Sequence, residues 1–279
     1  MAYKTILTVL SDIRQMTQLD AAAQLAVRDD GHLEILCIGV DHSQAGYYFP
    51  GGSAYAYQET IDNAMESAET LEKQVRDHLA GATDLKWSAE SAVAQLGGLA
   101  NLVGMRARFS DLTVLARPYG ADAPGDAEAV TEAALFEGGC PVLVIPENGL
   151  PVEVPNKILV AWNQSTEALA AIRRALPSLK KAKSVEITVI DPRRSGPERS
   201  DPGGALTQML TRHGVHAEIA VLARTEPSIS DELIRRALEI DADLIVMGAY
   251  GHSRFREAIL GGATRNMLEK AKVPVFMAR

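Results

Sequence analysis

The segment Ala242-Asp-Leu-Ile-Val-Met-Gly248 closely resembles an earlier segment of the same chain, Ser110-Asp-Leu-Thr-Val-Leu-Ala116. Each is a short apolar run that follows a helical pattern, which predicts a buried strand. A second pair of similar runs follows downstream, Cys140-Pro-Val-Leu-Val-Ile145 and Val273-Pro-Val-Phe-Met-Ala278. The chain therefore contains the same two predicted strands twice, in the same order.

Two further pairs of similar runs lie upstream. Lys4-Thr-Ile-Leu-Thr-Val9 resembles Lys157-Ile-Leu-Val-Ala161, and Leu33-Glu-Ile-Leu-Cys-Ile38 resembles Val185-Glu-Ile-Thr-Val-Ile190. Helical patterns separate the strands, as in residues 229–240, where apolar residues recur at helical spacing after a capping serine. Alternating strands and helices predict parallel β-α-β units with right-handed crossovers. We expect an α/β protein built from two similar halves.

The boundary between the halves is marked by Pro146-Glu-Asn-Gly-Leu-Pro-Val-Glu-Val-Pro155, a stretch rich in proline and turn residues. We place the first repeat in residues 1–148 and the second in residues 155–279. A length of 279 residues is ample for two domains, each with its own core.

The two repeats differ in length. Leu33 corresponds to Val185, an offset of 152, whereas Ser110 corresponds to Ala242, an offset of only 132. The extra residues of the first repeat fall in a tyrosine-rich insert at residues 46–58. The insert follows the end of a strand, so it is either a flap over a pocket, a contact between repeats, or a structural loop packed on the core.

Composition excludes several classes of protein. The formal net charge of −8 and the aromatic content of 5% argue against a nucleic-acid-binding surface. No run of about 18 apolar residues predicts a membrane span, and the polar start does not read as a signal peptide. The two cysteines have no motif spacing, which fits a reducing cytoplasm.

Several common active sites have no sequence signature in this chain. No glycine is followed by lysine as in a phosphate-binding P-loop, and the glycine pattern of dinucleotide-binding folds is missing. Cys-x-x-Cys, His-Glu-x-x-His and Gly-x-Ser-x-Gly motifs are missing as well. His213 and His216 offer only two of the four ligands that a structural zinc needs, so we predict no metal site.

The strongest positive signal is the glycine-rich segment that follows the strand of residues 243–247. Gly248 and Gly251 come directly after this strand, at the edge of a parallel sheet where α/β folds bind ligands. Gly261 and Gly262 precede a predicted helix of residues 263–271. Backbone N–H groups at a helix start favour an anion such as phosphate, although such glycines also serve as turns and caps.

The spacing Gly248-x-x-Gly251, nine residues, then Gly261 resembles the nucleotide loop of the universal stress protein family. The resemblance covers both halves, so the chain is similar to a tandem member of that family. It implies two Rossmann-like domains of the adenine-nucleotide-α-hydrolase type, each with a five-stranded parallel sheet of order 3-2-1-4-5 and flanking helices. It also implies binding of ATP or AMP, and pairing of the repeats as a pseudo-dimer or of chains as a homodimer.

The resemblance transfers to the second repeat residue by residue. Asn163 stands where the family has an adenine-contacting Asp; Trp162 beside it would narrow the base slot and Ile190 would line its other wall. Gly262 replaces the usual hydroxyl residue after the last glycine. The predicted nucleotide-binding residues are Trp162, Asn163, Ile190, Gly248, Gly251, His252, Gly261, Gly262, Ala263 and Thr264. Gly248→Asp should abolish binding if this loop holds phosphate.

The first repeat departs from the pattern. Ala116-Arg-Pro-Tyr119 stands where the second repeat has Gly248-Ala-Tyr-Gly251, and Glu128 replaces Gly261. A carboxylate at a helix start opposes an anion there. We therefore predict a degenerate first site.

Two function classes follow from this sequence. The first is a cytoplasmic sensor or adaptor of the stress response that binds ATP or AMP in its second repeat and has unidentified protein partners. No general base or Mg²⁺ carboxylate motif is visible, so it is not expected to be an enzyme beyond slow, incidental ATP hydrolysis. The second class is a nucleotide-independent interaction protein, or a carrier of a small apolar ligand.

Overall fold

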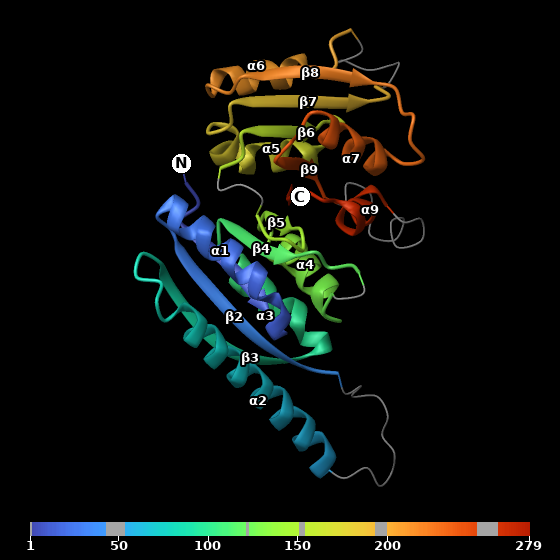
Figure 1. Cartoon of the computed structure of the whole chain (residues 1–279). Helices are drawn as coiled ribbons and strands as arrows, with labels where there is room; N and C mark the ends of the chain where they lie inside the picture. The colour runs from blue at the N-terminus through green and yellow to red at the C-terminus, as the bar shows by residue number, and fades with distance from the viewer. Residues whose placement is uncertain (1, 43–53, 121–122, 151–153, 193–199, 250–261) are drawn as a thin grey trace. The chain divides into compact units, whose positions relative to one another are not determined.

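The computed structural model describes residues 2–42, 54–120, 123–150, 154–192, 200–249 and 262–279. The chain divides into two compact units, residues 2–140 and residues 141–279. Each unit is an α/β structure with a mostly parallel sheet and flanking helices (Figure 1). The predicted fold class is confirmed, and the limits of the two repeats at residues 148 and 155 stay a prediction.

The first unit contains a parallel sheet of four strands in the order β3-β2-β1-β4. Its strands are β1 (Thr5–Leu10), β2 (His32–Asp41), β3 (Lys86–Gln95) and β4 (Leu112–Ala116). Its described helices are η1 (Ile13–Gln15), α1 (Met16–Asp29), α2 (Ala54–Leu79), η2 (Leu96–Gly98), α3 (Leu99–Ala107) and α4 (Ala127–Phe136).

The second unit contains six strands in the order β5-β10-β9-β6-β7-β8, parallel except for β5. They are β5 (Val142–Ile145), β6 (Lys157–Ala161), β7 (Ser184–Ile190), β8 (Ala217–Leu222), β9 (Leu244–Gly248) and β10 (Val275–Ala278). Its described helices are α5 (Thr166–Leu179), α6 (Gly204–Arg212), α7 (Ile229–Glu239) and α9 (Ala263–Lys270).

The strand order of the second repeat matches the expectation. Counted within residues 155–279, the order β8-β7-β6-β9-β10 is 3-2-1-4-5. The strand β5 lies beside β10 and runs antiparallel to it, with Val144 opposite Val275 and Val142 opposite Met277. Side chains along β5 and β10 are all buried, as expected for strands covered on both faces.

Equivalent contacts at the amino-terminal ends of the strands confirm that the two halves repeat one structure. Asp111 Oδ2 accepts hydrogen bonds from the backbone N–H groups of Lys4 and Thr5, at 2.8 and 3.1 Å. Asp243 Oδ2 accepts the equivalent bonds from Asn156 and Lys157, at 2.7 and 3.0 Å. These aspartates explain why both copies of the opening motif carry Asp before the buried strand.

A second pair of equivalent contacts ties a helix to the sheet in each unit. In the second unit, the Arg236 guanidinium on α7 donates two hydrogen bonds to Glu186 on β7, at 2.8 and 2.7 Å. In the first unit, Arg106 on α3 pairs with Glu34 on β2 at 3.4 Å. Glu34 and Glu186 hold the same place in the repeated strand, so the repeat extends to its ion pairs.

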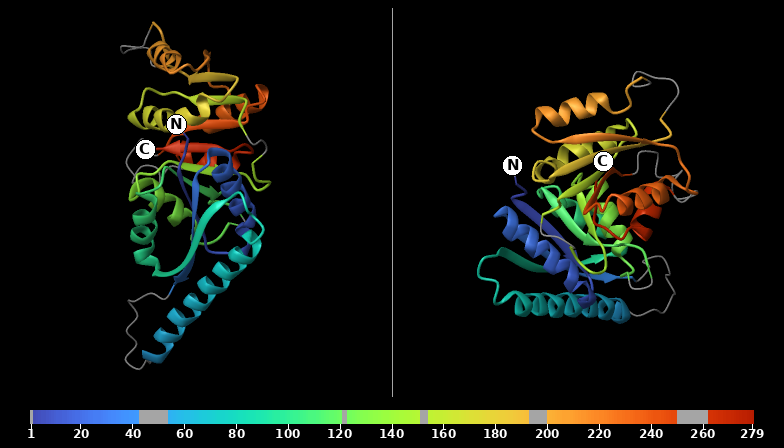
Figure 2. Two further views of the ribbon diagram at one scale, coloured as in Figure 1. Left: turned by 90° about the vertical axis from the view of Figure 1, so that its left-hand side faces the viewer. Right: turned by 45° about the horizontal axis from the view of Figure 1, so that its top comes forward.

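The long helix α2 lies along β2 and β3 of the first unit (Figures 1 and 2). Its buried side chains Ala68, Leu71 and Val75 form one stripe of helical spacing. The approach is closest at Gly39 of β2, where a Cβ atom would lie 1.9 Å from the Ala64 carbonyl oxygen. Glycine is therefore required at this position of β2. Within the described residues, we found no helix long and apolar enough to cross a bilayer.

Candidate functional site

The carboxyl-terminal ends of β6, β7 and β9 lie side by side in the second unit. The strand β6 pairs with β7 on one side and with β9 on the other. Trp162 and Asn163 follow β6, Ile190 ends β7 and Gly248 ends β9. The topology therefore brings these four predicted residues to the carboxyl edge of the sheet. Neighbouring strands lie on opposite sides of β6 there, and open α/β sheets bind ligands at such a switch point.

The Asn163 side chain closes a tight turn between β6 and α5. Its Oδ1 atom accepts a hydrogen bond from the Ser165 backbone N–H at 3.1 Å. Gln164 between them has a left-handed backbone with φ of 65°. The Ser165 hydroxyl then accepts from the Ala168 N–H at 3.1 Å and caps α5. Asn163 is exposed at the edge and fixed in place by this turn.

Trp162 and Ile190 differ in their surroundings. Trp162 is only 8% exposed, and its backbone N–H donates to Thr188 O at 3.0 Å. Its ring lies close to Gly203, at the start of α6. Ile190 is partly exposed and lies opposite Leu222 of β8. The Trp162 ring is thus a packing group under α6, while Ile190 remains accessible at the edge.

Gly248 has a packing role that the sequence did not reveal. A Cβ atom built on it would lie 2.5 Å from the Ala168 backbone nitrogen and 2.7 Å from the Glu167 carbonyl carbon. Both contacts are with backbone atoms of α5, which cannot rotate away. Because any side chain at this position disturbs α5, Gly248→Asp cannot serve as a clean test of phosphate binding.

The start of α9 carries the remaining described site residues. Gly262 is the N-cap residue, Ala263 is exposed and Thr264 is buried. A helix that connects two parallel strands runs antiparallel to them, so α9 begins at the carboxyl edge. Neither a capping side chain nor an acidic residue occupies its first turn. Gly251, His252 and Gly261 lie outside the described residues.

A network of hydrogen bonds at the start of α7 holds the neighbouring loop. The fully buried Glu232 accepts from the Thr225 N–H at 2.8 Å, the Thr225 hydroxyl at 3.0 Å and the Glu226 N–H at 3.0 Å. Arg235 pairs with the other carboxylate oxygen. Lys270 of α9 donates to Asp231 of α7 at 2.8 Å. The network positions α7, and through Lys270 it also positions α9.

Glu232 predicts a specific dependence of stability on pH. Its hydrogen bond with Arg235, followed by that from the Thr225 N–H, lowers the pKa of Glu232 from 4.5 to about 2. A carboxyl group with a lowered folded-state pKa stabilises the fold above its unfolded-state value of 4.5 and loses this contribution as the pH falls toward 2. Glu232→Gln should be less stable than the wild type at pH 7, and the difference should shrink below pH 4.5.

Urea unfolding between pH 2.5 and 7 measures this dependence. Glu239→Gln is the matched control, because Glu239 pairs with the same Arg235 but its side chain is 43% exposed. The control should change the pH profile little. A Glu232→Gln defect of equal size at pH 3 and pH 7 would contradict the assigned role.

The equivalent edge of the first unit is filled by its own polar side chains. Tyr119 donates its hydroxyl to Glu128 at 3.0 Å, and Glu128 lies in the first turn of α4. The N-cap residue Asp126 is buried and lies 3.5 Å from His42 Nε2. Gln18 Oε1 accepts the Ala116 N–H at 2.7 Å. The start of α4 thus carries two carboxylates where that of α9 carries none.

Sequence reasoning missed Asp12, which follows β1 much as Asn163 follows β6. Asp12 Oδ1 accepts the Arg14 backbone N–H at 2.9 Å, the same turn that Asn163 makes with Ser165. The Arg14 guanidinium also binds both carboxylate oxygens, at 3.0 and 2.7 Å, and its side-chain hydrogen bond lowers the pKa of Asp12. The sequence feature that could have revealed Asp12 is the Ser11-Asp12 pair directly after the first strand. In the structure, the Asp12 carboxylate is already paired with the Arg14 guanidinium.

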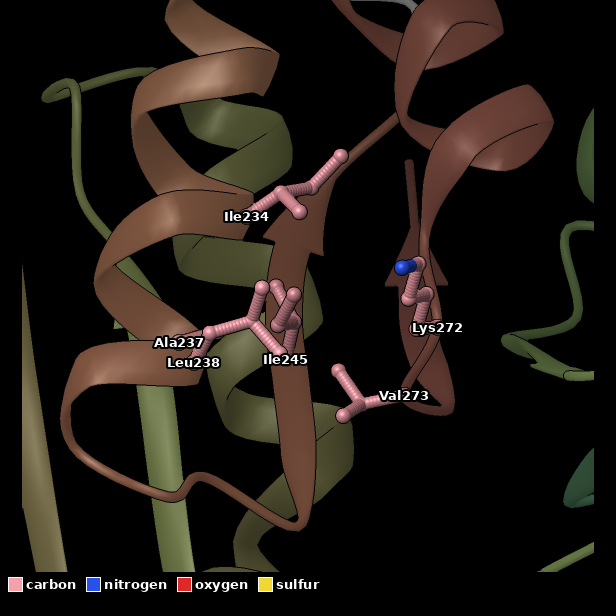
Figure 3. A pocket seen from close by; sticks show the side chains of 6 residues that line it. All are labelled: Ile234, Ala237, Leu238, Ile245, Lys272 and Val273. Carbon is pink, nitrogen blue, oxygen red and sulfur yellow. The ribbon is translucent and has the colours of Figure 1, made fainter.

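Other candidate sites in the described residues are weaker. A small apolar hollow between α7 and the amino ends of β9 and β10 is too narrow to admit water (Figure 3). Six residues line it: Ile234, Ala237, Leu238, Ile245, Lys272 and Val273.

Among the described residues, His, Cys, Asp and Glu side chains form no cluster of three that could hold a metal. Cys37 and Cys140 are both buried, and burial raises the pKa of the Cys37 thiol to about 12.

Comparison with known families finds a match for the second half of the chain. Residues 155–279 match the model of the universal stress protein family. A curated relative, universal stress protein Slr1230 of Synechocystis, is 28% identical over 141 residues. That match covers 50% of this chain and 47% of the relative, so the chain spans about half the length of the curated relative that it matches.

Solved structures extend the likeness in fold to both halves. A universal stress protein from Archaeoglobus fulgidus has a TM-score of 0.72 at 14% identity, and the match covers 99% of this chain and 98% of that one. A protein of unknown function from Pseudomonas aeruginosa PAO1 has a TM-score of 0.60 at 16% identity, covering 99% and 92%. Identities this low are informative about the fold alone.

Proposed function

We propose, on the premise that residues 155–279 are a universal stress protein domain, that the second unit binds a nucleotide such as ATP or AMP. The phosphate would lie at the start of α9, and the rest of the ligand would extend across the edge to Asn163 and Ile190. Gly248, Gly251, His252, Gly261, Gly262, Ala263 and Thr264 would surround the phosphate.

The observation that carries this proposal is the contrast between the starts of α9 and α4. Gly262 leaves the first turn of α9 without a side-chain cap, and no acidic residue lies there. Backbone N–H groups and the helix dipole favour an anion at such a position. At the start of α4, Asp126 and Glu128 supply carboxylates that would repel one. The residues at α9 therefore fit a phosphate group, and those at α4 do not.

The role that follows is a sensor or adaptor of the stress response in the cytoplasm, rather than an enzyme. Nucleotide occupancy would change which proteins the chain binds. The proposal includes domain limits of 1–148 and 155–279, with pairing either of the two repeats as a pseudo-dimer within one chain or of two chains as a homodimer.

Ala263→Glu tests the phosphate position without disturbing α5. Ala263 is exposed in the first turn of α9, so the new carboxylate would oppose an anion there without a steric clash. Repulsion between this carboxylate and the phosphate should weaken AMP and ATP binding at least about tenfold in calorimetric titration at low salt.

Ala205→Glu is the matched control. Ala205 is also exposed in the first turn of a helix, α6, of the same unit. It should leave affinity close to that of the wild type. Absence of any binding to the wild type at millimolar ATP or AMP would overturn the proposal and favour the nucleotide-independent interaction protein or apolar carrier.

A further inference from the structure

The strand β8 is the last strand of the sheet in the second unit. It pairs with β7, and no described strand lies on its other side. The backbone oxygens of His216 and Leu222 accept hydrogen bonds from the β7 side, at 3.1 and 2.9 Å. Backbone groups of successive residues point to opposite neighbours, so those of Ile219, Val221 and Ala223 point away from β7. Within the described residues, no group forms a hydrogen bond with them.

The strand β3, which holds the same place in the first unit, is protected. The long helix α2 lies along it (Figure 2). Arg76 of α2 donates a hydrogen bond to the Ala89 backbone oxygen, and its Cζ atom lies 5.8 Å from the centre of the Trp87 ring. The strand also begins with Lys86, a charge that discourages pairing with another chain. The strand β8 contains neither lysine nor proline, so it lacks these protective features.

The apolar face of β8 extends past the helix that covers it. A Cβ atom built on Gly203, the N-cap residue of α6, would lie 3.7 Å from Ile219 Cδ1. The helix therefore begins over Ile219, and it runs toward the amino ends of the strands because it connects two parallel strands. Val221 follows on the same face, beyond the start of α6. The exposed fraction accordingly rises from 37% at Ile219 to 51% at Val221.

The sequence of β8 is complementary to itself when two copies run antiparallel with Val221 at the centre. Val221 then lies opposite Val221 of the second copy, and Glu218 lies opposite Arg224. Residues directly opposite each other share one face of the sheet and interact, so this register joins opposite charges on both sides of the centre. Glu218 and Arg224 are both exposed, and their side chains have no partner in the part of the chain that the structure describes.

Steric and charge requirements favour this register over its neighbours. It sets Ile219 opposite Ala223, so the starts of the two α6 helices are separated by about 13 Å along the strands, and the helices run away from each other. Centring the pair on Ile219 would leave the helix starts only about 5 Å apart, less than the spacing of about 8–10 Å between packed helices. Centring it on Ala220 would set Arg224 opposite His216, without an opposite charge.

We propose that β8 is a contact surface for a second copy of this chain, which adds its own β8 antiparallel across a two-fold axis at Val221. The backbone groups that point away from β7 supply the hydrogen bonds, and the alternate side chains set the register. The two Val221 side chains bury each other at the axis. The contact does not depend on the nucleotide site, and it assigns a surface to the pairing of two chains.

Sedimentation velocity of the full chain, from low to high micromolar concentration, tests this contact. The wild type should show a concentration-dependent equilibrium between monomer and dimer. Val221→Lys sets two like charges opposite each other at the axis, so it should raise the dissociation constant of the dimer at least about tenfold. Val27→Lys is the matched control, because Val27 on α1 is 48% exposed. It should leave the dimer unchanged, and thermal melts should show that both variants stay folded.

A charge exchange tests the register. Glu218→Arg alone, or Arg224→Glu alone, opposes like charges and should weaken the dimer at least about threefold. The double variant restores both ion pairs and should regain the affinity of the wild type. A monomeric wild type, a dimer that Val221→Lys leaves intact, or a double variant without recovery would overturn the contact. Each of these outcomes leaves the nucleotide site standing, since titration with AMP and ATP measures that site separately.

Discussion

A Gly248→Ala variant should lose about 3 kcal/mol of unfolding free energy, the upper range for overpacking a well-packed site. The new Cβ atom would lie 2.5 Å from the Ala168 nitrogen and 3.0 Å from the Ala168 Cα. Relief requires α5 to move away from β9, and α5 also contacts β10 and carries the Asn163 turn at its start. The loss should be visible in urea unfolding of the full chain.

Gly98→Ala is the control for this variant. Gly98 has helical backbone angles, and a Cβ atom built on it meets nothing within 4 Å. It should change stability by less than about 1 kcal/mol. If Gly248→Ala unfolded like the wild type, the contact with α5 would not be the reason for a glycine at this position, and a role in the ligand loop would be the better explanation.

An Arg28→Met variant should lose about 3–5 kcal/mol, because it leaves a buried carboxylate without its arginine. Arg28 binds Asp29 through two hydrogen bonds of 3.2 and 3.0 Å at the end of α1. The two side chains are only 8% and 0% exposed. Methionine retains much of the apolar volume, so the loss reports the missing charge rather than a cavity.

Arg14→Met is the matched control for charge. Arg14 also pairs with a nearby aspartate, Asp12, but the two side chains are 57% and 29% exposed. Its loss should stay within about 1 kcal/mol. Equal effects of the two substitutions in urea unfolding would show that burial does not set the strength of the Arg28 pair.

The strands and their order could be predicted because they depend on local apolar runs repeated in one order. The predicted strand of residues 243–247 and the cap of the helix that begins at Ile229 correspond closely to β9 and α7. Ser228 caps α7 through the Asp231 N–H at 3.1 Å, as the sequence pattern indicates. Periodicity and capping depend on residues that are close together in the chain, so a single sequence is enough to predict them.

The features that the sequence did not predict depend on side-chain contacts that only the folded structure shows, most of them between residues far apart in the chain. Gly248 looks like a loop glycine until Ala168, eighty positions earlier, is seen to touch it. Asp12 resembles a ligand-binding carboxylate until Arg14 is seen to cover it. The antiparallel pairing of β5 with β10 likewise has no signature in either strand alone. Tertiary packing decides such cases, and it overrides local pattern.

The pairing of β5 with β10 has a consequence for any attempt to prepare the second repeat alone. A fragment that begins at residue 155 lacks β5, and the backbone N–H and C=O groups of β10 that face it would be left open. Such unpaired strand edges can pair with strands of other chains and thereby promote aggregation. A fragment that begins at Pro141 keeps β5 paired with β10. A cut ahead of the proline-rich stretch between the repeats therefore leaves β10 covered, whereas a cut within it does not.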